Sequence, residues 1–149
     1  MITEALLHLF ERDLDRLEKE VLAFTDEKDL WRTTGSVTNS AGNLCLHICG
    51  NLRHFIGATL GGSGYVRDRE REFAAREVPR TALIEEIANT RLAVNGTLIH
   101  LSGPDLIAPF PIAVFETEMS TASFLIHLQG HLNYHLGQIN YLRRIGFPG

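Results

Sequence analysis

Apolar residues recur at alternating intervals of three and four along much of the sequence. The clearest run lies in residues 2–24, where charged side chains fill most of the positions in between. This spacing places the apolar side chains on one face of an α-helix. The members of the run are Leu7, Phe10, Leu14, Leu17, Val21 and Phe24. Because such a helix must bury its apolar face against other elements, the pattern predicts an all-α protein built from packed helices.

Three further helices are expected, because capping residues and glycine or proline breaks bound three more stretches of apolar residues. They span about residues 40–61, 79–101 and 121–145. The expected architecture is a four-helix bundle forming one domain, residues 1–149, with long connections after the second and third helices.

The two long connections differ in composition. Residues 65–77 are densely charged and lack an apolar face, so a solvated loop is expected there. Residues 102–119 contain three prolines, which interrupt regular hydrogen bonding. They predict a crossing loop with a short extended piece at residues 112–115.

Charge and hydropathy exclude several classes of protein. The chain has 14 Lys and Arg against 18 Asp and Glu, a formal net charge of −4, and it has no basic cluster that could neutralise phosphates. No apolar run approaches the roughly 20 residues of a membrane span, and the first residues lack the features of a signal peptide. Cys45 and Cys49 share one expected helix, where they are poorly placed for a disulfide and suit a core in a reducing compartment. We therefore expect a cytoplasmic protein without nucleic-acid or membrane partners.

The fourth expected helix carries the most informative residues, because His127, His131 and His135 follow one another at intervals of four. A step of four residues advances about 40° beyond a full turn, so His131 and His135 point the same way. Two imidazoles inside a bundle leave polar nitrogens that need partners. The pair therefore predicts a chelating site for one metal ion, whereas His127 is rotated toward the rim and is expected to line the pocket.

The second expected helix offers a polar strip that could face this pair. His47, Asn51 and His54 lie within about 60° of one another on that helix. A single inward histidine is more often a hydrogen-bonded core residue than a ligand, so His54 receives no role from the residues alone. His47 is a possible partner for the pair on the fourth helix.

Gly130 and Gly137 lie inside the fourth helix, where each glycine costs about 1 kcal/mol relative to alanine. Two explanations are open at this stage. One is the close approach of another helix or backbone, and the other is room for a ligand beside the metal.

Two segments carry a resemblance to a known family: Leu-Cys-Leu-His-Ile-Cys-Gly-Asn-Leu-Arg-His-Phe-Ile-Gly around His47, and the H-x3-H-x-G-Q pattern from His131 to Gln138. Over almost its whole length the chain resembles the DinB-like (DinB/YfiT) four-helix bundles. The resemblance implies a bundle, commonly dimeric, that holds one divalent metal ion, usually zinc or nickel. It implies the ligands His47, His131 and His135. The further candidates for the pocket or for contacts to the ligands are Asn51, His54, His127 and Gln138.

The resemblance also suggests activities. Members with known activity include transferases and isomerases that use bacillithiol, mycothiol or glutathione, and others are described as metal-dependent hydrolases. Three neutral imidazoles leave a divalent ion with its full charge and an open position, which favours an anionic ligand such as a thiolate. Hydrolysis calls for a general base, and no carboxylate lies on the His47 strip or in the last-helix motif after Glu118.

The first expectation is therefore a metal-dependent thiol S-transferase or related isomerase that acts on a small molecule as a homodimer. The alternatives are a metal-dependent hydrolase of a small ester or amide, and a non-catalytic stress protein that binds metal or a small molecule.

Overall fold

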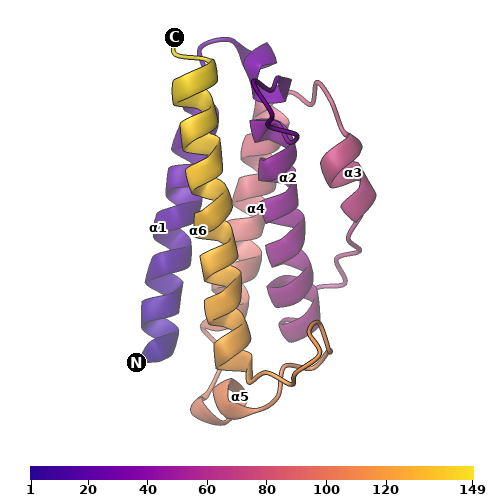
Figure 1. Cartoon of the computed structure of the whole chain (residues 1–149). Coiled ribbons are helices and arrows are strands. Elements are labelled where there is room, and N and C mark those ends of the chain that lie inside the picture. Colours follow the sequence, from indigo (N-terminus) through magenta and orange to yellow (C-terminus); the bar gives the residue numbers. More distant parts are fainter.

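A computed structural model describes residues 1–149, and its regular elements are helices. Four long helical segments run alongside one another (Figure 1). They are α1 (Ile2–Ala23), α2 (Ala41–Leu52) with its continuation as the π-helix η2 (Arg53–Leu60), α4 (Arg80–Leu98) and α6 (Thr121–Gly146). The shorter elements are the 3-10 helix η1 (Glu27–Trp31), α3 (Arg69–Ala74) and α5 (Gly103–Ile107). The predicted all-α class is confirmed.

The core forms where the apolar faces of the long helices meet. α1 packs against α4 and α6, and α2 packs against the same two helices. Five of the six apolar residues predicted for the inner face of α1 are buried, whereas Leu7 is partly exposed and Leu6 enters the core in its place. The spacing of apolar residues therefore identified the buried face of this helix correctly, apart from its first turn.

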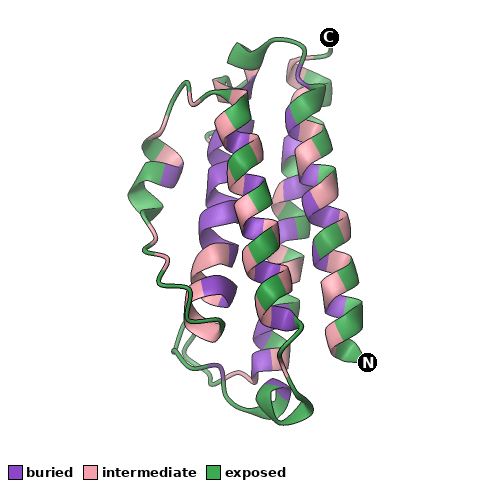
Figure 2. Ribbon diagram, turned by 180° about the vertical axis from the view of Figure 1, so that it is seen from behind, coloured by how far each residue is buried: buried purple, intermediate pink, exposed green.

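All 12 residues of α2 are buried, as Figure 2 shows. The helix begins after Ser40, whose Oγ accepts a hydrogen bond from the Asn43 backbone at 3.2 Å, as the capping prediction requires. α2 contacts α4 and α6, and α3 lies against it from outside (Figure 1). A helix covered on so many sides can bury polar side chains, provided that each one finds a partner.

The segment of residues 62–79, which we call the strap, connects η2 to α4 and contains α3. The expectation of a fully solvated loop here is wrong. Asp68 caps α3 by accepting a hydrogen bond from the Arg71 backbone at 3.0 Å, and Glu72 is buried against α2. Local sequence could not reveal this burial, because it depends on contacts with residues far away in the chain.

The connection between α4 and α6 also differs from its expected form. It contains the short helix α5, which starts with a capping box formed by Ser102 and Asp105. The expected extended piece at residues 112–115 is absent, and one isolated antiparallel bridge joins Pro109 to Ser120 instead. A lone extended segment has no neighbouring strand with which to form a sheet.

The helices also answer the question of membrane insertion. None of them combines the length and the apolar character needed to cross a bilayer.

Candidate metal centre

Three histidine side chains meet between α2 and α6. His47 comes from the buried helix α2, and His131 and His135 come from successive turns of α6. The Nε2 atom of His131 lies 3.1 Å from the Nε2 atoms of both His47 and His135. Ligand atoms of all three residues lie within 4.8 Å of one another, so this group could hold a metal ion.

In His47 and His135, the hydrogen-bond partner of Nδ1 determines whether Nε2 carries a lone pair or a hydrogen. His47 Nδ1 lies 3.0 Å from Glu72 Oε1, and His135 Nδ1 lies 2.6 Å from Gln138 Oε1. Both of these partners are acceptors, and the donor Arg67 Nη2 lies farther from His47 Nδ1, at 3.4 Å. The Nδ1 atoms of His47 and His135 therefore carry the hydrogens, and the neutral rings present lone pairs at Nε2. His131 Nε2 can donate at most one hydrogen to the two lone pairs that face it. This surplus of lone pairs at one point fits a cation, which a set of three imidazoles suits well.

The pKa values of the two α6 histidines of the cluster favour neutral rings. The pKa of His131 is lowered to about 4, first by burial and then by the nearby His135 and His47. Burial also lowers the pKa of His135, against an opposing effect of its hydrogen bond with Gln138. Neutral imidazoles are the form that binds metal, so the folded chain keeps its lone pairs available at neutral pH.

Glu72 is a site residue that the sequence reasoning missed. Its side chain is 5% exposed, and its carboxylate accepts hydrogen bonds from Arg67 Nε at 2.8 Å and Arg67 Nη2 at 2.9 Å, in addition to its contact with His47. Burial acts to raise the pKa of Glu72, but the bonds from His47 and Arg67 outweigh it, so the pKa lies below the usual range. The His47 strip itself carries no carboxylate, as the sequence shows, and the carboxylate that reaches His47 comes from the connection after η2. The only hint in the sequence was the density of charge at residues 67–72.

Two of the further candidates lie close to the three histidines. Gln138 contacts His135 directly, as described above. Asn51 lies one turn beyond His47 on α2 and is buried, and its Oδ1 atom has no hydrogen-bond partner. A buried amide oxygen without a partner is costly, so this side chain is a natural contact for a ligand at the site.

The other two candidates lie outside the cluster, beside aromatic side chains. The ring of His127 packs edge-on against Phe115 at 4.9 Å, and its centroid lies 6.5 Å from that of His131. His54 packs against Phe55 at 4.8 Å, and its pKa is lowered by burial and then by the charge of Arg67. Neither residue belongs to the group of three histidines that could hold a metal ion.

The glycines and cysteines of the site helices also have clear positions. A Cβ atom added to Gly130 or Gly137 would meet no atom within 4 Å, so close approach within the chain does not explain these glycines. Cys45 and Cys49 are free and buried in the core, as expected. The contact with Cys49 and burial raise the pKa of the Cys45 thiol well above its ordinary value.

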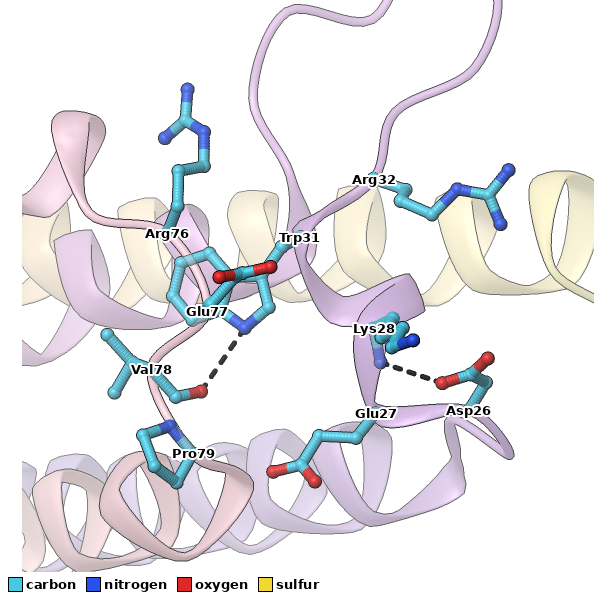
Figure 3. A pocket seen from close by; sticks show the side chains of 9 residues that line it. All are labelled: Asp26, Glu27, Lys28, Trp31, Arg32, Arg76, Glu77, Val78 and Pro79. Atoms are coloured by element: carbon cyan, nitrogen blue, oxygen red, sulfur yellow. Dashed lines mark hydrogen bonds between the residues drawn. The ribbon is translucent and has the colours of Figure 1, made fainter.

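Cavities lie both beside the cluster and away from it. A cavity of about 420 Å³ is lined by Gln138 and by Leu44, which precedes His47 by one helical turn. Cavities of this size accommodate small molecules. A larger cavity of about 760 Å³ lies between η1 and the end of the strap, around Trp31 and Glu77 (Figure 3). None of the three clustered histidines lines either cavity.

The fold and the cluster thus define an all-α protein with three histidines, from two helices, that could bind one metal ion. Comparison with protein families agrees with this class, because the model of the DinB family matches residues 1–148. The chain belongs to the DinB family. No curated protein matches the sequence.

Proposed function

We propose that the chain is a single four-helix-bundle domain that binds one divalent ion, zinc or nickel, through His47, His131 and His135. We further propose that it acts as a metal-dependent thiol S-transferase or related isomerase with a low-molecular-weight thiol. The observation that carries the proposal is the convergence of the Nε2 atoms of the three histidines. In two of them, His47 and His135, the Nδ1 atom is hydrogen-bonded to an acceptor. A divalent ion bound there lowers the pKa of a thiol or water molecule that contacts it.

The surrounding residues favour a thiol over water as the reactant. Hydrolysis calls for a free general base, and the carboxylate beside the cluster, that of Glu72, is engaged by His47 and by both donors of Arg67. Its lowered pKa also makes it a weak base. A thiol is acidic enough to ionise with little help from a side-chain base, so this site suits it better. Hydrolysis of a small ester or amide is the second candidate, with His127 as the group that could accept a proton.

Space and polar contacts for a substrate are present on both sides of the cluster. The cavity lined by Leu44 and Gln138 is linked to the cluster through Gln138, which contacts His135. Asn51 lies one turn beyond His47 on α2, and its amide oxygen has no hydrogen-bond partner. The rings of Phe115 and Phe124 lie near His127, one turn before His131 on α6. A ligand with a polar part and an apolar part would contact both regions.

The first test is the metal content of untagged protein purified without chelator or added metal. We expect about one zinc or nickel ion per chain in the wild type. His47→Ala and His131→Ala should lose it while retaining wild-type helicity by circular dichroism. His100→Ala, at an exposed histidine outside the cluster, is the matched control and should keep the ion. A wild-type chain that is metal-free and cannot be loaded with zinc or nickel contradicts the proposal.

The second test concerns the reaction. Purified protein is assayed with bacillithiol, mycothiol and glutathione against an aryl halide, and separately with a panel of aryl esters. We expect thiol conjugation that disappears in His131→Ala. Ester hydrolysis without thiol conjugation supports the second candidate. A metal-loaded chain inactive in both panels supports the third possibility, a non-catalytic binding protein.

A homodimer is also proposed. Four apolar or aromatic residues on the outer side of α6 are exposed: Ile126, Tyr134, Tyr141 and Ile145. Such a row would be covered in an interface between two copies. Light scattering at working concentration should give twice the mass of the chain, and a monomer mass contradicts this part of the proposal.

A further inference from the structure

The strap brings three side chains against the ring of His47: Glu72, Arg67 and Phe73. Glu72 is the only residue of the strap that is buried. Its neighbours on α3, such as Glu70 and Arg71, are exposed. The apolar side chains of the strap that face the rest of the protein, Phe73, Ala75 and Val78, are only partly buried, so polar contacts contribute to holding the strap on α2.

Those polar contacts are few and specific. Asn43 on α2 donates hydrogen bonds from Nδ2 to the backbone oxygens of Glu72 and Ala75, each at 2.9 Å. At the end of the strap, Trp31 Nε1 donates to the Val78 oxygen at 3.2 Å, as Figure 3 shows. Segments held by a few polar contacts open more readily than the apolar core.

The position of Glu72 also depends on a glycine in α2. A Cβ atom on residue 50 would overlap with Glu72 Oε2, so only glycine leaves room for the carboxylate there. Glycine inside a helix costs about 1 kcal/mol relative to alanine. Close approach of Glu72 gives a physical reason for Gly50, in contrast to Gly130 and Gly137, whose Cβ positions are open.

The contact between Glu72 and His47 joins the strap to the cluster. A buried carboxylate needs strong hydrogen-bond donors, and His47 and Arg67 are the two residues that donate to the carboxylate of Glu72. A cation at the other nitrogen of His47 would polarise the ring and strengthen this bond, and the carboxylate in turn fixes the orientation of the ring toward the cation. Such coupling must act equally in both directions.

We propose that Glu72 is a positioning residue for His47, and that docking of the strap and binding of a divalent ion at the three histidines strengthen each other. This inference rests on the proposed function only in requiring that the cluster binds metal. Arg67 completes the arrangement, because it balances the charge of Glu72 and lies on the strap itself. The strap is then a part of the metal site that can dock and undock.

The affinity for Zn²⁺, measured by competition with a chromogenic chelator, tests the positioning role. Glu72→Gln keeps the shape of the side chain but weakens its acceptor, and we expect the affinity to fall about 10- to 100-fold. Glu70→Gln, on the exposed side of the same helix, is the matched control and should stay within about twofold of wild type. An equal affinity of Glu72→Gln and wild type overturns the proposal.

A second pair of variants changes no residue whose side chain belongs to the site. Gly50→Ala introduces a methyl group where Glu72 Oε2 lies, and should displace the carboxylate and lower the affinity for Zn²⁺. Gly96→Ala adds the same group to α4, where nothing lies within 4 Å, and should leave the affinity unchanged. Circular dichroism verifies that both variants remain helical. Unchanged Zn²⁺ affinity in a folded Gly50→Ala protein also overturns the proposal.

Amide hydrogen exchange of the strap tests the linkage directly. We expect exchange in residues 66–76 to slow by about 10-fold or more when Zn²⁺ is added to wild type, and much less in Glu72→Gln. Wild-type protein that binds Zn²⁺ with no change in strap exchange overturns this inference and leaves the proposed function intact. Wild-type protein that binds neither Zn²⁺ nor Ni²⁺ overturns both.

Discussion

Asp13 on α1 and Glu72 in the strap are both buried carboxylates with arginine partners, but their remaining partners differ. Asp13 is fully buried and accepts hydrogen bonds from Gln129 Nε2 at 2.7 Å and Asn133 Nδ2 at 3.1 Å, which belong to α6. Glu72 instead contacts His47, whose second nitrogen points into the histidine cluster.

The difference shows that burial alone does not identify a functional carboxylate. The amides that contact Asp13 have no second role, so this carboxylate ties α1 to α6 and stabilises the fold. The imidazole that contacts Glu72 is a candidate metal ligand, so here the hydrogen bond to a buried carboxylate orients that ligand. The two residues should therefore respond oppositely to tests of stability and of metal binding.

The largest loss of stability is expected for Asp13→Ala. Removing this carboxylate leaves the amide donors of α6 without their acceptor inside the protein, and we expect the free energy of unfolding to fall by about 2–3 kcal/mol. Urea denaturation of metal-free protein provides the measurement. Asp15→Ala, at a partly exposed position of the same helix whose carboxylate forms a surface ion pair with Lys19, should lose less than about 1 kcal/mol. A loss in Asp13→Ala no greater than in the control would contradict the role assigned to Asp13.

Glu72→Ala should show the opposite pattern. In our proposal the strap can open while the rest of the protein stays folded. The loss in free energy of unfolding of metal-free Glu72→Ala should therefore be less than about half of that for Asp13→Ala. The rise in melting temperature on adding Zn²⁺ should, however, shrink in Glu72→Ala and remain at the wild-type value in Asp13→Ala, because it reports metal affinity. Equal zinc-induced shifts in the two variants would remove the distinction between the carboxylates.

A smaller effect on the free energy of unfolding is expected from pH, and it concerns the histidine cluster that Glu72 contacts. The pKa of His131 is lowered to about 4 in the fold, whereas an unfolded histidine titrates near about 6.5. Between these values the unfolded chain binds a proton that the folded, metal-free chain does not. The free energy of unfolding should therefore fall as the pH drops through this window, and be unaffected by this group above it.

Denaturation of metal-free protein in the presence of chelator, at about pH 7.5, 6 and 5, measures this dependence. His131→Gln removes the titrating group and should flatten the slope, although His135, whose pKa is also lowered, will retain part of it. An identical slope in wild type and His131→Gln would show that His131 does not titrate in this range. The lowered pKa of Glu72 adds a further loss of stability only in more acidic solution, where the unfolded carboxylate takes up its proton first.

The smallest effect is expected at Gly130, the neighbour of Gln129. Because its Cβ position is open, Gly130→Ala should raise the free energy of unfolding by about 0.5–1 kcal/mol through helix propensity. Its effect on Zn²⁺ affinity should be small compared with that of Gly50→Ala, which crowds Glu72. A loss of stability in Gly130→Ala would indicate that this face of α6 is covered in solution, as in the proposed dimer.

Much of the fold followed from the sequence because helices are local structures. The three-and-four spacing of apolar residues identified the inner face of α1. Capping residues at 39–40 and 120–121 predicted the starts of α2 and α6, and the structure selects Ser40 and Ser120 as the caps. The same local geometry placed His131 and His135 one turn apart on one face of α6. The prediction of an extended piece at residues 112–115 was wrong, because strand formation depends on a partner strand that no local pattern supplies.

The sequence by itself determined which side chains share a helix face, since the rotation per residue is constant along an α-helix. It could not determine what crosses from one element to another. Glu72 lies 25 positions after His47, on a charged segment with no apolar face, and reaches it only because Asn43, Trp31 and the space above Gly50 hold the strap on α2. The tertiary structure alone decided this contact, because a buried ion pair forms where separate segments meet, and its stabilisation depends on all of its partners at once.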